Sequence, residues 1–468
     1  MPKMTYTSPS SSPHPIRPRL IIHGGAGNIL PSNLPPSDHH AFTTALLHIL
    51  ARTHAYQTTT PLPTALDAAT HAVTLLENCP LFNSGHGAVF TRDGTNELEA
   101  SVMVSRGLKK RGVGVMGLSR VRNPVQLARQ MLLRGETDLD SGNGEHRGPM
   151  VADEEGVLMK ASGAQGHSQL FGPAAERLAK EWGVDLVETS YFFTQKRWDE
   201  HVAGLDREKR GGCATWDAES FVSQGTCGAV ALDAEGVVCA ATSTGGMTNK
   251  LAGRVGDTPT LGAGFWAEEW EGVVRGGGGG GAVVELEGAL RGVLADCFPG
   301  WGGYGYLPLG SEGVVERRGD TVVRAMGMSG TGNGDSFLRV NAVRTVSAIA
   351  KYRGDGSTTS LGEALREVTG PGGELQKSAG KRWKKTGEGE GGMIGIECAV
   401  VKGPDGEVRG TKAYVAAEYN CGGMFRATVN EDGKAVARVW NEGQYGGLEG
   451  YENEGKEHDP RDLKGEKA

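Results

Sequence analysis

A Gly-Thr pair, Gly225 and Thr226, stands immediately before a strand-like apolar run over residues 229–233. A threonine hydroxyl inside a chain is a poor nucleophile, but a threonine that becomes the first residue of a chain carries its own base. The freed α-amino group has a pKa of about 7.7–8.0, so a useful fraction of it is neutral near pH 7. Most Gly-Thr pairs are simple turn or strand-entry dipeptides. The placement nevertheless makes Thr226 a candidate nucleophile and its bond to Gly225 a candidate cleavage site.

Two strand-like segments, residues 226–233 and 237–244, are joined by a three-residue turn that ends in Gly236. A hairpin loop of this length with glycine in its last, left-handed position is a favoured type. In the register that this turn sets, Thr226 lies opposite Thr244, with the two Cβ atoms about 4.5–5.5 Å apart. A slip of one residue would separate them, so the prediction depends on the turn.

Composition excludes several classes of protein. The chain has 468 residues, of which 38% are hydrophobic, and its net charge is −7. This length allows two or three domains or one large sandwich, and the charge argues against nucleic acid or an anionic membrane as the main partner. The 7 cysteines are irregularly spaced and contain no C-x-x-C pair, which disfavours a disulfide scaffold or a zinc site. The first 18 residues lack an apolar core, and no apolar run reaches the ~18 residues of a membrane span. We therefore expect a cytoplasmic protein.

Strand and helix patterns alternate in the first half of the chain. We expect strands over residues 19–23, 87–91, 97–104 and 113–118, and helices over about 38–57, 63–78, 123–135 and 173–182. Thr64 and Asp67 form a weak capping-box pattern at the start of the second helix. Residues 194–224 are charged and are expected to be irregular.

The second half is dominated by hairpins. We expect helices over about 336–352 and 360–369, a linker over 370–391, and strands near 321–327, 393–401, 407–417, 424–430 and 434–440. Strands mixed with helices and followed by hairpins suit a layered sandwich with helices outside antiparallel sheets.

Several glycine-rich and acidic strings fail as known motifs. No G-x-G-x-x-G follows the first strand, no P-loop accompanies the glycines at 330–334, and there is no H-E-x-x-H or G-x-S-x-G string. Three other strings carry chemistry more plausibly. Thr244 ends a strand with a hydroxyl, Arg254 and Asp257 are a surface ion pair or a clamp for a zwitterion, and Thr331 with Gly332 offers donors to an oxyanion.

These strings together resemble one family closely. The resemblance rests on Gly-Thr-Cys-Gly-Ala-Val-Ala-Leu-Asp from Gly225, Thr-Ser-Thr-Gly-Gly from Thr242, Gly-Arg-Val-Gly-Asp-Thr-Pro from Gly253 and Thr-Gly-Asn-Gly-Asp from Thr331. His-Gly-Gly-Ala-Gly at 23–27 and the segments 82–90 and 417–427 agree with it. The chain resembles the plant-type L-asparaginase and isoaspartyl peptidase family of N-terminal-nucleophile hydrolases over most of residues 19–440, apart from 136–165, 268–323 and 370–391.

The resemblance implies an α+β fold, a four-layer αββα sandwich of the N-terminal-nucleophile hydrolase type. It also implies a precursor that cuts itself between Gly225 and Thr226 and a homodimer of the cleaved αβ units. The implied parts are a disordered tail over 1–18, an α subunit over 19–225, a β subunit over 226–451 with an insertion at about 268–323, and a charged tail over 452–468.

The resemblance further implies a reaction and the residues that perform it. Thr226 would hydrolyse L-asparagine and β-aspartyl dipeptides through an acyl-enzyme, with Thr244 tuning the nucleophile and no cofactor required for catalysis. Arg254 and Asp257 would grip the α-carboxylate and α-ammonium of the substrate. The remaining implied site residues are Thr331 and Gly332 in the oxyanion hole, Asn83 near the nucleophile, Asn333 and Gly334 in the substrate pocket, and a possible structural sodium loop at Glu77, Asn78, Cys79 and Phe82.

Two departures from the family pattern leave alternatives open. Asn333 stands where asparaginases of this group usually carry histidine, and the string around it resembles the glycosylasparaginase branch. Cys227 replaces an aliphatic residue, and we expect it to pack rather than react. A glycosylasparaginase, a threonine aspartase and an unprocessed, non-catalytic binding relative remain competing readings, and the sequence does not settle the preferred substrate. A glycine-rich nucleic-acid binder would need basic charge and interleaved aromatic residues that the chain lacks.

Overall fold

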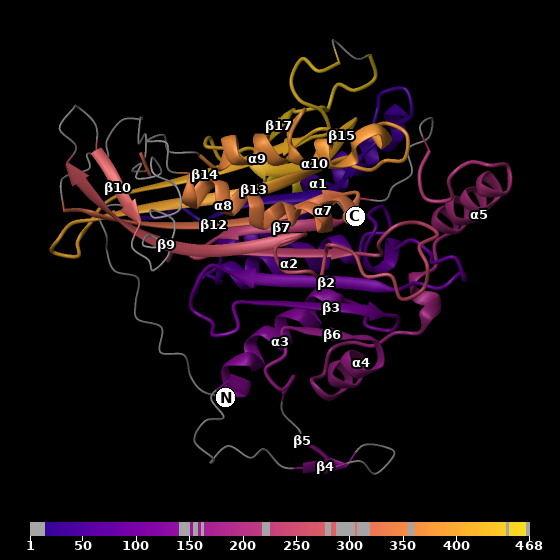
Figure 1. Ribbon diagram of the computed structural model, residues 1–468, viewed down its shortest axis with the longest axis horizontal. Coiled ribbons are helices and arrows are strands. Elements are labelled where there is room, and N and C mark those ends of the chain that lie inside the picture. Colours follow the sequence, from indigo (N-terminus) through magenta and orange to yellow (C-terminus); the bar gives the residue numbers. More distant parts are fainter. Residues whose placement is uncertain are drawn as a thin grey trace.

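The computed structural model describes residues 15–139, 150–152, 158–160, 163–217, 225–276, 282–286, 305–306, 319–353, 360–445 and 449–464. Within these residues the strands form a nine-stranded sheet, a six-stranded sheet and a separate two-stranded pair. Helices pack against both of the larger sheets (Figure 1). The chain therefore combines helices with mainly antiparallel sheets, as an α+β fold does.

The larger sheet has the strand order β17-β16-β15-β1-β7-β8-β2-β3-β6. Its pairs are antiparallel except for β3 and β6, which run parallel. The strands are β1 Arg19–Gly27, β2 Leu98–Val104, β3 Gly112–Leu118, β6 Gln169–Phe171, β7 Cys227–Leu232, β8 Val238–Thr244, β15 Gly423–Val429, β16 Ala435–Arg438 and β17 Glu457–His458. The candidate nucleophile thus precedes a strand in the middle of the sheet.

The smaller sheet has the order β11-β10-β9-β12-β13-β14. Its strands are β9 Phe265–Gly276, β10 Ala282–Leu286, β11 Gly305–Tyr306, β12 Thr321–Gly332, β13 Gly391–Lys402 and β14 Val408–Tyr419, and the separate pair is β4 Met150–Ala152 with β5 Leu158–Lys160. β9 pairs with β12 from Phe265 opposite Ser329 to Val273 opposite Thr321. The first residues of the expected insertion, from 268, therefore belong to β9, and most of its remainder lies outside the described residues.

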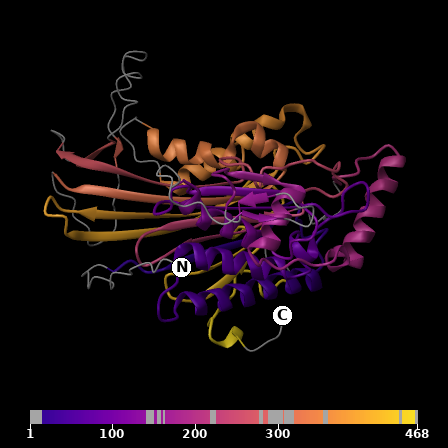
Figure 2. The same ribbon diagram turned by 90° about the horizontal axis from the view of Figure 1, so that it is seen from below.

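The helices divide between the two sheets. α1 contacts β1, β15 and β16, α2 contacts β7 and β8, α3 contacts β2 and β3, and α4 contacts β3, whereas α8 contacts β9 and β12, and α9 contacts β13 and β14. Their bounds are α1 Pro36–Gln57, α2 Ala65–Glu77, α3 Pro124–Leu139, α4 Gly172–Glu181, α5 Gln195–Lys209, α7 Gly334–Val340, α8 Ala342–Tyr352, α9 Leu361–Thr369 and α10 Glu374–Ala379. In Figure 2 the indigo and the orange helices lie on opposite sides of the strands.

β7 shows how the core is built on both faces of one strand. Val230 and Leu232 belong to an apolar cluster that also contains Ile394 of β13 in the smaller sheet. Ala229 and Ala231 belong to a second cluster that contains the apolar face of α2. Successive side chains of a strand point to opposite faces, so one face of β7 packs toward the smaller sheet and the other toward a helix. Small alanines on the helix side let α2 approach the strand closely.

Several sequence predictions are confirmed. The β7–β8 hairpin has the predicted register, with Leu232 opposite Val238 and Cys227 opposite Ser243. Gly236 closes the turn at φ +79°, in the left-handed region that glycine favours. The predicted capping box also forms, with the Thr64 side chain accepting from the backbone N–H of Asp67 at the start of α2.

Other predictions are wrong. Residues 195–209, expected to be irregular, form α5, which the Thr194 hydroxyl caps and which buries the guanidinium of Arg197. Residues 87–91, expected as a strand, instead begin within the short 3-10 turn Gly85–Gly87 and end in an isolated bridge between Thr91 and Lys250. The expected linker 370–391 contains α10 and a series of turns. Of the expected tails, residues 1–14 and 465–468 lie outside the described residues.

Candidate active site

The bond between Gly225 and Thr226 lies against the glycine-rich end of β1. A Cβ atom placed on Gly225 would lie 2.1 Å from the Cα of Gly25, which is closer than real Cβ contacts. A Cβ atom on Gly25, whose φ is +128°, would in turn lie 2.9 Å from the Cα of Gly225. Both positions therefore need glycine, because two backbones meet here without room for a side chain.

Thr226 is buried, with 4% of its surface exposed, at the start of β7. Its Oγ1 lies 3.4 Å from Oγ1 of Thr258. The hairpin register, continued by one pair beyond Cys227 and Ser243, places Thr226 opposite Thr244. Thr244 Oγ1 accepts the backbone N–H of Gly246 at 3.0 Å. The Thr226 and Thr258 hydroxyl groups thus meet where β7 begins, and the Thr244 hydroxyl lies at the end of the neighbouring strand β8.

Asn83 fixes the end of β8 beside these hydroxyl groups. Its side-chain amide donates to the carbonyl of Gly246 at 2.7 Å, and its Oδ1 accepts from the backbone N–H of Val89 at 3.0 Å. The Asn83 carbonyl also accepts from the backbone N–H of Gly245 at 3.1 Å. Asn83 is fully buried, so these contacts hold the turn after Thr244 rigidly in place.

Arg254 and Asp257 lie close to the start of α7. Arg254 Nη2 lies 2.9 Å from Oδ1 of Asp335. A Cβ atom on Gly334 would lie 2.4 Å from Asp257 Oδ1 and 3.0 Å from Arg254 Nη2, so this glycine leaves room for both side chains. Burial raises the pKa of the Asp257 carboxyl to about 7, although the nearby Arg254 lowers it. The Oδ2 atom of Asp257 is buried and makes no hydrogen bond within the described part of the chain.

Glu99 of β2 lies close to Arg254 and binds the backbone next to Asp257. Its Oε1 accepts the backbone N–H of Gly256 at 2.9 Å. Burial raises the pKa of the Glu99 carboxyl, whereas the positive charges of Lys250 and Arg254 lower it. Burial in turn lowers the pKa of the Lys250 ammonium. Positive and negative groups therefore lie next to each other here, and Arg254 is close to the carboxylates of both Glu99 and Asp335.

Thr331 and Gly332 end β12 next to the scissile region. Thr331 is buried, and its Oγ1 accepts the backbone N–H of Ala26 at 3.2 Å. Gly332 has φ +139°, and a Cβ atom there would lie 2.4 Å from the carbonyl oxygen of Glu390. Since Ala26 follows Gly25, which touches Gly225, these contacts connect β12 to the candidate nucleophile.

Asn333 and Asp335 each contact neighbouring protein groups at the start of α7. Asn333 Oδ1 accepts from the backbone N–H of Ser336 at 3.0 Å and from its hydroxyl at 2.8 Å, which caps the helix. The Asn333 backbone N–H donates to the carbonyl of Glu390 at 2.9 Å. Asn333 is predicted to contact substrate, and its Oδ1 is engaged in this cap.

His23 of β1 forms a buried polar chain behind Thr226. Its Nε2 lies 2.8 Å from Ser329 Oγ, which lies 2.8 Å from Thr242 Oγ1. Burial lowers the pKa of His23 to about 3, although interaction with the Thr226 backbone raises it. A Cβ atom on Gly228 would lie 2.3 Å from His23 Nε2, so this glycine admits the ring. The ring is therefore neutral at pH 7.

The predicted sodium loop lies on the far side of β8. Glu77 Oε1 accepts from Ser243 Oγ at 2.7 Å and from the backbone N–H of Val125 at 2.9 Å, and burial raises the pKa of Glu77 to about 7. The carbonyls of Cys79 and Phe82 each accept one backbone N–H, at 3.4 and 2.9 Å. A carbonyl has two lone pairs, so these oxygens retain capacity for a hard cation.

The remaining residues of that loop have packing or capping roles. Asn78 is the C-cap of α2, and the Phe82 ring centroid lies 5.7 Å from that of Phe42. No group of three or more His, Cys, Asp or Glu side chains suited to a metal occurs among the described residues. Cys227 is fully buried, which raises the pKa of its thiol well above the ordinary value and suits packing rather than reaction.

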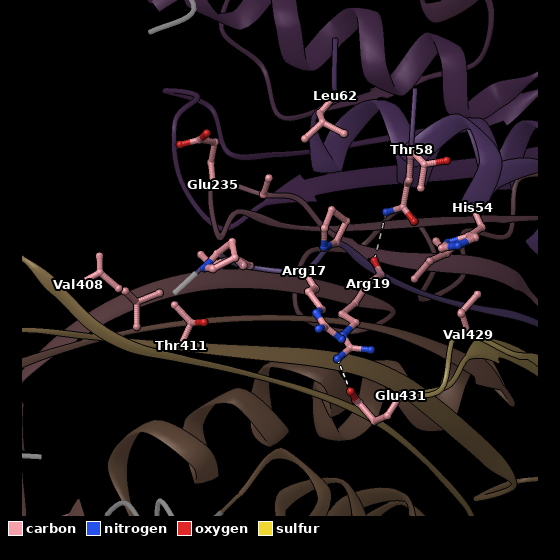
Figure 3. A pocket seen from close by; sticks show the side chains of 18 of the residues that line it. Arg17, Arg19, His54, Thr58, Leu62, Glu235, Val408, Thr411, Val429 and Glu431 are labelled. Atoms are coloured by element: carbon pink, nitrogen blue, oxygen red, sulfur yellow. Dashed lines mark hydrogen bonds and ion pairs between the residues drawn. The ribbon is translucent and has the colours of Figure 1, made fainter. Parts of the chain in front are cut away.

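Two cavities differ in their relation to these residues. A cavity of about 660 Å³ lies beside Ala234 and Glu235, at the end of β7 remote from Thr226 (Figure 3). A smaller cavity of about 40 Å³ is lined by Ala26, Gly332 and Asn333, next to the candidate site. The size of a cavity therefore does not identify the candidate active site. The site is identified by the polar side chains that lie close together.

Sequence reasoning missed four residues that the structure adds to the site: Glu99, Lys250, Thr258 and Asp335. Thr258 and Asp335 stand inside strings that had already been singled out, so a closer examination of each string would have found them. Glu99 had one signal, a carboxylate within an otherwise apolar strand. Lys250 gave no signal, because a single lysine in a polar segment is ordinary.

Comparisons with known proteins agree with this geometry. The family model described as asparaginase matches residues 16–146 and 158–293. The isoaspartyl peptidase of Escherichia coli (strain K12) is 38% identical over 253 residues, covering 53% of this chain and 67% of that protein. The isoaspartyl peptidase/L-asparaginase of Rattus norvegicus is 32% identical over 267 residues, covering 57% and 67%. An Arabidopsis thaliana protein named "Probable isoaspartyl peptidase/L-asparaginase 2" is 27% identical over 450 residues, covering 90% and 98%. The chain belongs to the asparaginase family of hydrolases.

Proposed function

We propose that this chain is an autoprocessing amidohydrolase that converts L-asparagine to L-aspartate and ammonia and cleaves β-aspartyl dipeptides through a Thr226 acyl-enzyme. The observation that carries the proposal is the hairpin register, in which Cys227 lies opposite Ser243. Continued by one pair, this register would set Thr226 opposite Thr244 at the ends of two central strands, which supports their assignment to one site. Relatives named isoaspartyl peptidase and L-asparaginase supply the substrate class.

Maturation is the first reaction. The Thr226 hydroxyl attacks the carbonyl carbon of Gly225, and the acyl group moves from nitrogen to oxygen. Water then hydrolyses the ester, which leaves Gly225 with a carboxylate and Thr226 with a free α-amino group. Tight contact between Gly225 and Gly25 restrains the carbonyl, and such restraint favours an attack geometry that a flexible loop would lack.

Hydrolysis of substrate uses the group that maturation creates. The α-amine takes the proton of the Thr226 hydroxyl, whose oxygen attacks the side-chain amide carbon of the substrate. Thr331 and Gly332 stabilise the developing oxyanion, and the ammonium returns its proton to the leaving amine. Water then releases aspartate from the ester by the same route in reverse.

Arg254 and Asp257 select the substrate by charge. Arg254 forks onto the α-carboxylate, and Asp257 accepts from the α-ammonium. The orphaned, buried Oδ2 of Asp257 supports this assignment, because a buried carboxylate oxygen needs a donor. Gly334 gives the substrate access to both groups. Thr244 and Asn83 position the nucleophile from β8.

The proposal has parts beyond the reaction itself. They are a four-layer αββα sandwich of the N-terminal-nucleophile type, α and β subunits over 19–225 and 226–451, a homodimer of cleaved αβ units, a cytoplasmic location and catalysis without a cofactor. The distribution of α1–α4 and α8–α9 over different sheets supports the sandwich. No helix among the described residues has the length and apolarity of a membrane span. A sodium ion on the Glu77–Phe82 loop remains a prediction.

A second candidate is glycosylasparaginase activity on the same scaffold. One observation favours it, namely that the residue between Gly332 and Gly334 is asparagine. Its weight is limited, because the Asn333 oxygen caps α7. A threonine aspartase, or an unprocessed binding relative, would share the fold without the same substrate clamp or without scission.

One experiment tests the proposal. Purified wild-type protein should mature into two bands, each about half of 49.2 kDa, and release aspartate from asparagine and β-aspartyl-leucine. The Thr226→Ala variant should stay as one inert chain. Full activity in that variant, or an active wild type without a fragment that begins at Thr226, would refute the assignment. Glycosylated asparagine as a third substrate separates the two candidate activities.

A further inference from the structure

A carboxylate lies beside the expected oxyanion hole without a role in the steps above. Glu390 lines the small cavity together with Gly332 and Asn333. Its backbone carbonyl accepts the N–H of Asn333 at 2.9 Å, so Glu390 directly flanks the residues expected to hold the oxyanion. Burial raises the pKa of the Glu390 carboxyl.

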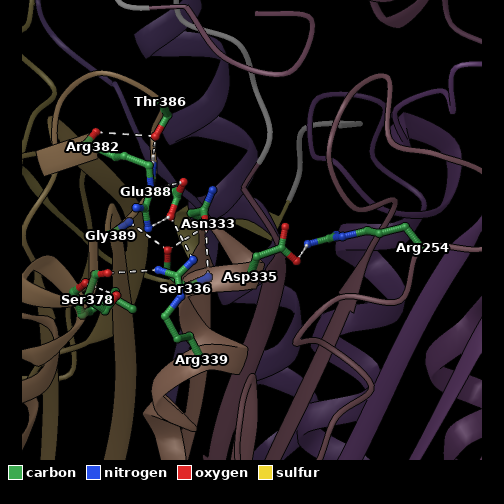
Figure 4. A network of polar contacts seen from close by, with 11 residues as sticks. Arg254, Asn333, Asp335, Ser336, Arg339, Ser378, Arg382, Thr386, Glu388 and Gly389 are labelled. Carbon is green, nitrogen blue, oxygen red and sulfur yellow. Dashed lines mark hydrogen bonds and ion pairs between the residues drawn. The ribbon is translucent and has the colours of Figure 1, made fainter. Parts of the chain in front are cut away.

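The segment that carries Glu390 is held from two sides (Figure 4). The Gly389 N–H donates to Ser336 Oγ at 2.9 Å, and the Gly389 carbonyl accepts from the Asn420 amide at 2.9 Å. Glu388 pairs with Arg339 at 2.9 Å and with Arg382 at 2.7 Å. A side chain on a segment pinned in this way is presented in a fixed position, as a specificity-determining group needs to be.

In the uncleaved chain the Trp216 indole lies beside Glu390. Trp216 lines the same cavity, and a Cβ atom on Gly387 would lie 2.3 Å from Trp216 Cδ1. The indole lies close enough to the Glu390 carboxyl to lower its pKa, while its Nε1 makes no hydrogen bond within the described residues. Asp217, the other acid in the cavity, is paired with Arg207 at 3.2 Å. Glu390 is thus the carboxylate beside the indole in this cavity.

From this arrangement we infer that Glu390 determines leaving-group specificity by attracting positively charged, donor-rich amines and disfavouring anionic ones. The Trp216 indole occupies part of this cavity in the uncleaved chain, and scission between Gly225 and Thr226 makes Gly225 a new chain end nine residues after it. A β-aspartyl peptide whose second residue is lysine places an ammonium in this cavity. One whose second residue is glutamate places a second carboxylate beside Glu390, which costs affinity. The inference rests on the proposed function and deepens it.

The test compares three dipeptides, β-aspartyl-lysine, β-aspartyl-leucine and β-aspartyl-glutamate, by their kcat/KM values on matured enzyme. Wild type should prefer lysine to glutamate by about tenfold or more. Glu390→Gln should reduce that ratio at least about fivefold. Glu407→Gln removes the same charge at an exposed position at the other end of β13 and should leave the ratio as in wild type. The wild-type ratio should also fall as salt is raised, which needs no variant.

The outcomes distinguish a failure of the Glu390 role from a failure of the proposed hydrolase function. A wild-type enzyme that treats the lysine and glutamate substrates alike, or a Glu390→Gln variant with an unchanged ratio, overturns the inference while leaving the hydrolase intact. Wild-type protein that hydrolyses none of the dipeptides and no asparagine overturns the proposed function, and the inference with it. A simple loss of fold would lower all three rates together and would not change their ratio.

Discussion

The guanidinium of Arg254 is paired with the carboxylate of Asp335, with Nη2 and Oδ1 2.9 Å apart. Asp335 exposes 55% of its side chain, whereas Arg254 exposes 18%. The more exposed partner is the one that an incoming carboxylate can displace, since an exposed ion pair is weak. Asp335 therefore holds Arg254 in position in the absence of substrate.

Substitution of Arg254 should weaken binding more than chemistry. A fork onto the substrate carboxylate is made equally in the ground state and in the transition state, so its loss raises KM with little change in kcat. We expect Arg254→Ala to raise KM for asparagine at least about tenfold, consistent with loss of a charge-assisted pair. Steady-state kinetics over a range of asparagine concentrations measures both constants. Arg461→Ala is the control, because its guanidinium pairs with Asp459 at 2.7 Å near the end of the described chain, and an unchanged KM in Arg254→Ala argues against the clamp.

A methyl group at Gly225 should slow maturation. Its Cβ atom would lie 2.1 Å from Gly25 Cα, so one backbone must move and the scissile carbonyl loses its restraint. We expect Gly225→Ala to fold and to cut itself at least about tenfold more slowly than wild type. The uncut fraction on denaturing gels over time gives the rate. Gly362→Ala is the matched control, because its Cβ atom would have its nearest contact at 3.6 Å. Cleavage of Gly225→Ala at the wild-type rate would show that the close approach is unimportant.

Local chemistry explains which parts of the fold were predictable. The β7–β8 register followed from one glycine turn, because Gly236 adopts the left-handed conformation that this loop needs. The α2 boundary followed from Thr64 and Asp67, which bond to each other across one helical turn. Both signals lie within a few residues of the feature that they determine. The asparaginase resemblance added the site, because its strings carry the hydroxyls and charges that converge.

Other parts depend on contacts between distant residues and so escaped prediction. α5 reads as a charged, irregular stretch, yet Arg197 is buried because the carbonyls of Leu81 and Gly87 accept its N–H groups at 2.8 Å. The cap at Asn333 also went unpredicted, because it depends on Ser336, three residues on, which donates to its oxygen. The position of Glu99 behind Arg254 depends on strand pairing between β2 and β8. Tertiary contacts of this kind override local propensity.

Substrate binding should weaken at acid pH through Asp257. The pKa of its carboxyl is raised to about 7, chiefly by burial, and only the ionised form accepts from the substrate ammonium. The Thr226 amine alone should make kcat/KM for asparagine fall about tenfold per pH unit below its own pKa, and protonation of Asp257 should steepen this fall toward about a hundredfold per unit below about 7. Asp257→Asn should have low kcat/KM and keep only the tenfold slope set by the Thr226 amine. An equally steep fall in the variant would assign the second ionisation to another group.

The same shift has a consequence for stability. A carboxyl whose pKa is raised on folding binds its proton more tightly in the folded state, so its favourable contribution is lost as pH rises through about 7. Asp257→Asn in the uncut Thr226→Ala background should therefore be more stable than its parent at pH 8, and the two should be closer at pH 5. Urea denaturation at both pH values measures the difference. A variant that is less stable than its parent at pH 8 would contradict the shift.

His23 should produce the opposite dependence on pH. Its pKa is lowered to about 3, chiefly by burial, so between pH 3 and its ordinary pKa of 6.5 the unfolded chain binds a proton that the folded chain does not. Stability is then complete above about 6.5 and declines as pH falls, by at most about 1.4 kcal/mol per pH unit for one proton. His23→Asn keeps a donor for Ser329 and removes this titration. In the Thr226→Ala background it should be less stable than its parent at pH 7 and lose less stability between pH 7 and pH 4.5, as urea denaturation would show. Parallel declines in the two proteins would mean that the buried imidazole is not the group that titrates.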